Sequence, residues 1–174
     1  MLPRSLALAS ILAVAAALAG CGYSRVAYPK SREQSLSVAV QVFENRSFDP
    51  GYENVVADAL KEEFARRGAL RLTRSPETAD VVLRGVVQNV GTGRRSFSSV
   101  VLTLEYSVNV ALEIELQRPG TEIGIDRRVL REDDTYLASA DIEVTRRNRQ
   151  EALRRIASLL ATRIHDVVFE VAPP

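Results

Sequence analysis

A long stretch of alternating apolar and polar residues, at positions 100–116, constrains the fold more than any other part of the chain. Its apolar side chains share one face of an extended chain, and they are Val100, Leu102, Leu104, Tyr106, Val108, Val110, Leu112, Ile114 and Leu116. Alternation of this kind predicts a β-strand with one buried face and one polar face. At about 3.3 Å per residue the strand would span roughly 56 Å, whereas ordinary strands have about five or six residues. We therefore expect it to bend, or to project beyond the core as one arm of a hairpin.

Shorter strand patterns surround this stretch. Residues 36–42 alternate and predict a strand with one buried face. Residues 69–73 are a candidate for a short strand, and residues 81–87 predict a buried one. Residues 122–133 are weakly patterned and rich in charge, as edge strands often are. Residues 135–145 show no regular pattern and are interpreted as irregular.

Two amphipathic stretches predict helices. The first covers residues 50–67, with Asp49 as the expected N-cap and Gly68 in the left-handed position that ends a helix. The second closes the chain, and Asn148 with Glu151 three residues later resembles a capping box at its start. The element order is therefore β-α-β-β-β-β-α. This order favours an α+β fold in which two helices pack on one face of a mostly antiparallel sheet.

The segment that carries Arg94 and Arg95 lies between two strand patterns. Gly91, Gly93 and Ser96 mark it as a loop at the tip of a hairpin. Arginine suits bidentate contact with phosphate or carboxylate groups, so the pair is a candidate site for an anionic ligand. The alternative is that both side chains serve solubility or surface ion pairs with the many glutamates.

The N-terminal segment has the pattern of a secretory signal. Arg4 precedes an apolar run at residues 6–18, and the small residues Ala19 and Gly20 stand directly before Cys21. This pattern resembles the bacterial lipobox, which implies diacylglyceryl attachment to Cys21 and cleavage before it. The alternative is a signal anchor with an incidental cysteine, but the run is shorter than the about 20 apolar residues of a membrane span.

Cleavage before Cys21 would remove 20 of the 174 residues and leave a mature chain of 154. We expect residues 1–20 to be the lipoprotein signal peptide, residues 21–35 a lipidated tether and residues 36–171 a single α+β domain. One of the 23 basic residues lies in the signal, so 22 basic and 22 acidic side chains remain, which argues against a generic nucleic-acid binder. Acyl chains on Cys21 would anchor the chain, and Gly22 rather than Asp at the next position favours the outer membrane.

Catalytic and metal-binding patterns are missing from the sequence. His165 is the only histidine and Cys21 the only cysteine, which is too few for a zinc site of the usual kind. No nucleophile elbow, phosphate-binding loop or dinucleotide-binding loop occurs. Asp133 and Asp134 would point to opposite faces of a strand, so a solvated turn is favoured over acid–base chemistry. We therefore expect no enzyme activity, no cofactor and no metal, and we expect His165 to be partly exposed on the closing helix.

Short segments spread over nearly the whole mature chain carry a family resemblance. In order, they are Cys21-Gly22-Tyr23, Val38-Ala39-Val40-Gln41-Val42-Phe43-Glu44-Asn45-Arg46-Ser47, Gly51-Tyr52-Glu53, Ala79-Asp80-Val81-Val82-Leu83-Arg84-Gly85, Leu104-Glu105-Tyr106, the residues Tyr136, Ser139 and Asp141, and Glu151-Ala152-Leu153-Arg154-Arg155-Ile156-Ala157. In this order they resemble the LptE lipopolysaccharide-assembly lipoproteins.

The resemblance implies a non-catalytic lipoprotein of the cell outer membrane. Family members are anchored in the inner leaflet of that membrane, sit as a plug inside the LptD β-barrel, assist its assembly and help deliver lipopolysaccharide to the outer leaflet. They also bind lipopolysaccharide through basic residues near the β-hairpin tip, and Arg94 and Arg95 fall in the matching hairpin. The implied partners are thus an LptD-type barrel and lipopolysaccharide. The alternative is a periplasm-facing lipoprotein that binds a small ligand or peptidoglycan, or an auxiliary subunit of another lipid transporter.

Overall fold

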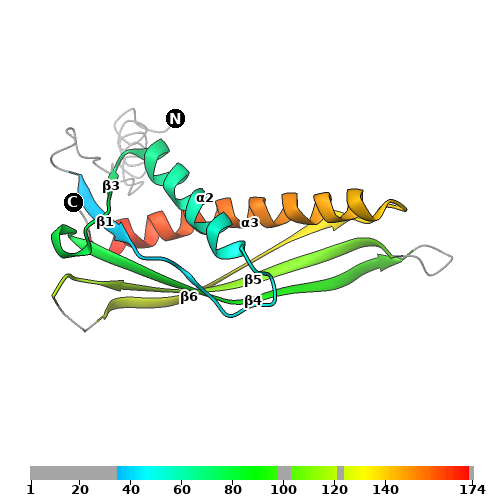
Figure 1. Ribbon diagram of the computed structural model, residues 1–174, viewed down its shortest axis with the longest axis horizontal. Helices are drawn as coiled ribbons and strands as arrows, with labels where there is room; N and C mark the ends of the chain where they lie inside the picture. The colour runs from blue at the N-terminus through cyan, green and yellow to red at the C-terminus, as the bar shows by residue number, and fades with distance from the viewer. Residues whose placement is uncertain (1–34, 98–102, 121–123, 173–174) are drawn as a thin grey trace, which may run out of the picture.

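The computed structural model describes residues 35–97, 103–120 and 124–172, so Cys21, the expected signal peptide and most of the expected tether lie outside the described residues. In chain order the elements are β1 (Leu36–Val40), β2 (Glu44–Asn45), α2 (Tyr52–Arg67), β3 (Leu70–Thr73), the 3₁₀ turn η2 (Pro76–Thr78), β4 (Val81–Phe97), β5 (Thr103–Gln117), β6 (Gly124–Leu137) and α3 (Ile142–Val171). Figure 1 shows both helices on the same side of one sheet, with α3 running along it. This arrangement confirms the predicted α+β fold and the order of its main elements.

The sheet combines an antiparallel meander with a parallel part. Its strand order is β3-β1-β4-β5-β6, and β2 lies beside β4. β4, β5 and β6 pair antiparallel, whereas β1 pairs in parallel with both β3 and β4, and β2 pairs in parallel with β4. Parallel pairing of β1 with β3 arises because α2 forms the crossover between them. The prediction of a mostly antiparallel sheet therefore holds for the three long strands, while the sheet as a whole is mixed.

β5 is the strand that the alternating stretch predicts. Its side chains at Val108, Val110, Leu112, Ile114 and Leu116 are at most 1% exposed. β4 pairs with it along nearly its whole length, so the two form a long hairpin. The apolar positions 100–102 lie outside the described residues. The prediction of a long strand with one buried face is confirmed over the described part of the stretch.

The segment predicted as a loop around Gly91 and Gly93 is instead the outer half of β4. A Cβ atom on Gly91 would lie 2.8 Å from the Asn109 side chain of β5, and one on Gly93 would lie 3.0 Å from the Ser107 hydroxyl. These glycines therefore permit close approach of polar side chains from the neighbouring strand, a role that glycine has in strands as well as in turns. The sequence pattern alone does not separate the two roles.

α2 begins later than predicted. Its N-cap is Gly51, at a φ of 91°, and not Asp49. The Asp49 carboxylate binds the Arg149 guanidinium of α3 at 2.7 Å instead, so it does not cap the helix. The predicted end is confirmed, because Gly68 has a φ of 66° and its N–H donates to the Phe64 carbonyl.

α3 begins earlier than predicted. Its N-cap is Asp141, whose carboxylate accepts a hydrogen bond from the Glu143 N–H at 2.8 Å. Asn148, the predicted cap, lies within the helix and donates its side-chain amide to the Leu137 carbonyl at 2.9 Å. Residues 135–145, predicted to be irregular, therefore hold the end of β6 and the first turn of α3.

The charged residues of β6 attach α3 to the sheet, and β6 is an edge strand as predicted. Three ion pairs cross from one element to the other: Arg128–Glu170, Arg163–Glu132 and Arg155–Asp134. Each pair is partly exposed, so each adds little to stability on its own. Their spacing along both elements favours one alignment of the helix over the sheet.

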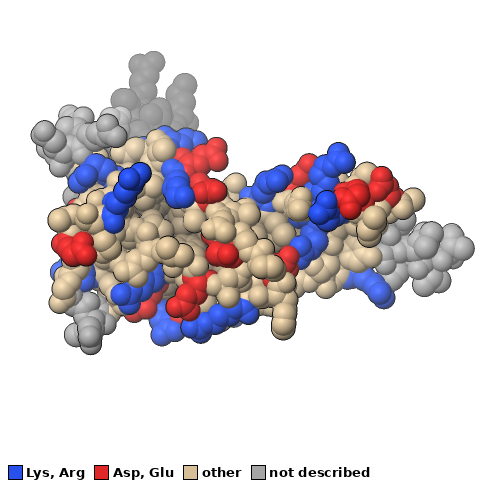
Figure 2. Space-filling model, in the orientation of Figure 1, with Lys and Arg blue, Asp and Glu red and all other residues tan. Residues whose placement is uncertain are grey.

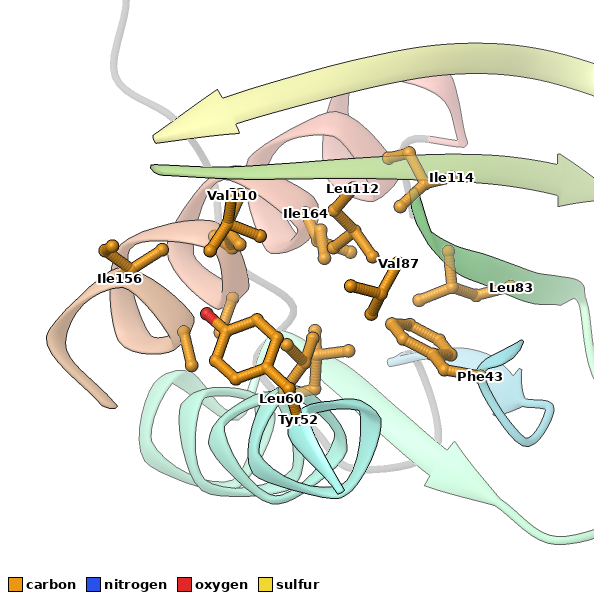
Figure 3. Packing of buried hydrophobic residues seen from close by; sticks show 14 of the residues in the cluster. Phe43, Tyr52, Leu60, Leu83, Val87, Val110, Leu112, Ile114, Ile156 and Ile164 are labelled. Atoms are coloured by element: carbon orange, nitrogen blue, oxygen red, sulfur yellow. The ribbon is translucent and has the colours of Figure 1, made fainter. Parts of the chain in front are cut away.

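The core lies between this sheet and the two helices. Figure 3 shows Leu83 and Val87 of β4 and Val110 and Leu112 of β5 pointing into the same space as side chains from both helices. The helix residues in that view are Tyr52 and Leu60 of α2, and Ile156 and Ile164 of α3. The two helices and the sheet therefore share a single apolar core.

Among the described glycines, Gly85 of β4 leaves the least space for a Cβ atom. A Cβ atom there would lie 2.7 Å from the ring of Phe43, which is only 3% exposed. We expect Gly85→Ala to lower the free energy of unfolding by about 1–3 kcal/mol, because overpacking forces buried groups to move. Chemical denaturation measures the change. Adding Phe43→Leu should recover part of the loss, and equal stability of Gly85→Ala and the native chain would contradict the tight contact.

His165 is buried, which corrects the expectation of a partly exposed side chain. It is 1% exposed and contacts the Phe64 ring edge-on, with 5.5 Å between ring centroids. Its Nδ1 lies 3.2 Å from the Arg67 guanidinium. Burial, and then the positive charge of Arg67, hold the pKa of His165 below its ordinary value despite nearby Asp166. The expectation failed because α2 covers this face of α3, which the pattern of α3 alone does not reveal.

This lowered pKa makes stability depend on pH. Because the unfolded chain binds a proton at His165 more readily than the folded chain, we expect the free energy of unfolding to fall as the pH drops below the ordinary value of 6.5. Urea unfolding at about pH 7.5 and about pH 5.5 measures the loss. His165→Gln, which does not titrate, should lose less over the same interval. Equal losses in the two proteins would show that His165 is not responsible.

Candidate functional site at the hairpin end

Arg94 and Arg95 lie near the last residues of β4, and both side chains are exposed. Arg94 pairs with Tyr106 of β5 and Ser96 pairs with Glu105, so Arg95 is the extra residue of a β-bulge. The structure therefore places the predicted pair near the end of the hairpin, as expected, but on a strand rather than in a loop. A bulge turns the local side chains away from the regular pleat, which exposes residues at a strand end.

Two stacked tyrosines lie next to this pair. Tyr106 of β5 and Tyr136 of β6 are opposite each other, and their ring centroids are 5.4 Å apart at an interplanar angle of 15°. Burial raises the pKa of Tyr136, so its hydroxyl stays protonated at neutral pH. Tyr136 is 7% exposed. The stacked rings fix the end of the three-stranded meander.

Arg149 of α3 ties three elements together behind the tyrosines. Its guanidinium makes two hydrogen bonds of 2.7 Å to the Asp49 carboxylate and a third, of 3.4 Å, to the Thr92 hydroxyl of β4. The hydrogen bond to Asp49 is also the main reason that the pKa of Arg149 is raised. Arg149, which lies within α3, thus has its charge paired and holds neighbouring elements together.

Most other arginines at this end of the molecule do not form ion pairs. Within the described residues, Arg94, Arg95 and Arg147 form no ion pair, whereas Arg146 pairs with Glu143. Two large apolar side chains are exposed at the same end, Leu137 at 64% and Ile142 at 76%. We call Arg94, Arg95, Leu137, Ile142 and Arg147 the hairpin end. Figure 2 shows basic, acidic and uncharged side chains close together at this end of the molecule.

The hairpin end combines cationic and apolar groups, which is the chemistry that recognises an anionic amphiphile. Guanidinium groups bind phosphate oxygens, and exposed aliphatic side chains contact acyl chains. The sequence identified Arg94 and Arg95 but not Leu137 or Ile142. Exposure of apolar residues between a strand and a helix depends on where both elements end, and both ends differ from the predicted ones.

A separate candidate site is a hollow on the sheet face opposite the helices. It has a volume of about 350 Å³ and is lined mainly by polar side chains, including Arg84, Gln88, Glu113 and Arg127. Arg127 and Gln88 both donate hydrogen bonds to Glu113, and they hold the pKa of that carboxyl below its ordinary value, with Arg127 as the larger cause. Because these charges neutralise one another, the hollow is a weaker candidate for a charged ligand.

The described part of the chain offers no group of three or more His, Cys, Asp or Glu side chains placed to hold a metal ion. Neither of its helices is both long and apolar enough to span a membrane.

Solved structures of other lipoproteins share this fold. Rare lipoprotein B from Shewanella oneidensis superposes with a TM-score of 0.54 at 16% identity, covering 74% of this chain and 93% of that one. The minor lipoprotein from Acinetobacter baumannii gives a TM-score of 0.51 at 18% identity, covering 74% and 86%. The uncharacterized lipoprotein B from Nitrosomonas europaea gives 0.52 at 11% identity, covering 87% and 94%. At these identities the likeness shows the fold alone.

Comparison of the sequence with protein-family models identifies the family, which the shared fold alone does not. A search of the curated proteins found no match. The family model described as "LptE: Lipopolysaccharide-assembly" matches residues 36–167, which span β1 to the last turns of α3. Because this match covers most of the chain and the fold agrees with it, the chain belongs to the LptE family of lipopolysaccharide-assembly proteins.

Proposed function

We propose that this chain is a lipid-anchored lipoprotein of the outer membrane that plugs an LptD-type β-barrel, helps to assemble it, and assists delivery of lipopolysaccharide to the outer leaflet. Membership of the LptE family supports the general role in lipopolysaccharide assembly. The observation that carries the proposal is the hairpin end, where basic groups with no ion-pair partner among the described residues stand beside exposed apolar ones near the end of a long hairpin.

The anchor and the hairpin end would lie at opposite ends of the domain. The tether leads into β1, which pairs with the first residues of β4, whereas Arg94 and Arg95 lie near the last residues of β4. With Cys21 acylated in the inner leaflet, the domain would stand on the periplasmic side of the membrane and enter the barrel from there. Polar side chains on the sheet face opposite the helices suit a barrel lumen that is itself polar.

Association with a barrel is tested by purification in mild detergent. We expect the Cys21-anchored protein, isolated through a C-terminal tag, to carry a large outer-membrane β-barrel at a constant ratio. A tagged lipoprotein of an unrelated family, expressed at the same level, controls for adventitious capture. If no barrel accompanies the protein under conditions that preserve other outer-membrane complexes, the plug function is wrong.

Lipopolysaccharide binding is tested at Arg94 and Arg95. The double change to Glu should leave the fold intact, because exposed substitutions usually cost less than about 0.5 kcal/mol. We expect affinity for lipopolysaccharide to fall about tenfold or more, because phosphate contacts become repulsive. The loss should be larger at low salt, where exposed charges are least screened.

The matched control changes Arg74 and Arg154 to Glu. Both side chains are exposed, and both lie outside the hairpin end, so the net charge changes equally while the proposed site stays intact. If the native chain and the Arg94/Arg95 variant bind lipopolysaccharide with equal affinity, these two arginines are not part of a lipopolysaccharide site. If both double variants lose the same affinity for lipopolysaccharide, the loss comes from the change in net charge and not from a specific site.

A further inference from the structure

The outer half of β4 has an edge with no strand beside it. β1 pairs with residues 81–83 and β2 with residues 86 and 87. Within the described ranges, nothing pairs with that side of β4 from residue 88 to residue 97. Figure 1 shows this part of β4 at the border of the sheet, past the point where the β2 segment turns away toward α2. Main-chain N–H and C=O groups along such an edge are free to pair with another strand.

The edge is regular over six residues. Register shifts at Gln88 and Arg95 bound it, and residues 89–94 between them pair one-to-one with residues 111–106 of β5. Six extended residues span about 20 Å, the length of an ordinary strand. α3 packs over β5 and β6, and the side chains of Arg149 and Tyr136 reach this part of β4 at the Thr92 side chain, not along its main chain. Gly91 and Gly93 add no side chains that would cover the main chain.

In natural proteins, charged side chains and bulges commonly prevent an edge strand from pairing with strands of other molecules. Here both bulges lie at the limits of the regular edge and not within it, and the charges, Arg94 and Arg95, stand at one end only. Neither arginine has a carboxylate partner within the described residues. This arrangement repels a basic strand and admits an acidic one.

From this geometry we infer that residues 89–94 accept an added β-strand, namely an extended segment of a partner polypeptide that places carboxylates next to Arg94 and Arg95. A second copy of this chain is not the fitting occupant, because residues 88–97 contain no acidic side chain. Main-chain pairing would supply affinity, and the arginines would select the partner by charge. This inference goes beyond the proposed function, because neither plugging a barrel nor binding lipopolysaccharide requires a strand to be added at this edge.

The experiment uses the full chain in detergent and a ten-residue synthetic peptide with three Thr-Val repeats between Glu-Glu pairs at both ends. Placing glutamates at both ends allows either strand direction. The control peptide has Lys-Lys pairs in their place. We expect the glutamate peptide to bind at least tenfold more tightly, and the Arg94→Glu, Arg95→Glu variant to reverse this preference.

Residue-resolved amide hydrogen exchange reads out strand addition directly. In a two-stranded ladder every second amide of β4 faces away from β5, so alternate amides within residues 89–94 should exchange fast in the free protein and at least tenfold more slowly with the glutamate peptide. Binding without slower exchange at these amides would mean side-chain docking only and would overturn the inference. Slower exchange on raising the protein concentration without peptide would assign the edge to a second copy. Neither lipopolysaccharide nor a barrel is present, so the result is independent of the tests of the proposed function.

Discussion

Ile156→Asp is expected to abolish cooperative folding. Ile156 lies in the middle of α3, is completely buried, and faces the sheet side chains shown in Figure 3. A buried carboxylate without a partner costs several kcal/mol, against a total stability of about 5–15 kcal/mol for a domain. Far-ultraviolet circular dichroism during heating measures the result, and the variant should show no sharp transition.

Leu159→Asp is the matched control. It makes the same chemical change three residues later on α3, at a side chain that is 50% exposed. We expect this variant to melt close to the native protein. A native melting transition in Ile156→Asp would mean that the core does not lie on this face of α3.

Cys21→Ser is expected to leave an unprocessed precursor without lipid. The thiol sulfur is the acylation site in the predicted lipobox, and the serine hydroxyl does not replace it. Mass spectrometry should find residues 1–20 still attached, and fractionation should show that the protein no longer behaves as a lipid-anchored one. Gly22→Ala, one residue away, should be processed normally. Normal cleavage and outer-membrane fractionation of Cys21→Ser would refute the lipoprotein prediction.

Of the two strands in the long hairpin, β5 is the one that the sequence predicts well. Val108, Val110, Leu112 and Ile114 recur at every second position, and this face of β5 is indeed buried. An alternating pattern predicts a strand reliably where one face of the strand is buried. A shift of the strand register by one residue would there expose every apolar side chain to solvent. The parallel pairing of β1 could not be predicted from such a pattern. It depends on which edge of the sheet the chain returns to after a helix or a loop.

The errors at element ends have a common physical cause. Asp49 and Asn148 both have the side chains of helix caps, but each makes a tertiary hydrogen bond instead, to Arg149 and to the Leu137 carbonyl. Local propensity is outweighed wherever a distant partner satisfies the same side chain. The expectation that His165 is partly exposed fails for a similar reason, because the helix that buries it is remote in sequence.

Only the charged residues Arg94 and Arg95 of the candidate site could be predicted from the sequence. Arg94 and Arg95 could be placed near a hairpin end because strand patterns flank them. Leu137 and Ile142 could not be added, because their exposure depends on the junction between β6 and α3. Arg149 resembles Arg147 in sequence, and only the structure shows that Asp49 neutralises it.

In vivo photocrosslinking from two opposite faces of the domain tests the central proposal, a plug surrounded by a barrel, most directly. Asn109 lies on the exposed sheet face, between the buried neighbours Val108 and Val110, and Leu159 lies on the exposed side of α3. With a photoreactive amino acid at either position, a plug predicts crosslinks from both faces to the same barrel protein. Crosslinks from one face only would indicate a partner docked on one side, and no barrel crosslink from either position would contradict the proposed function.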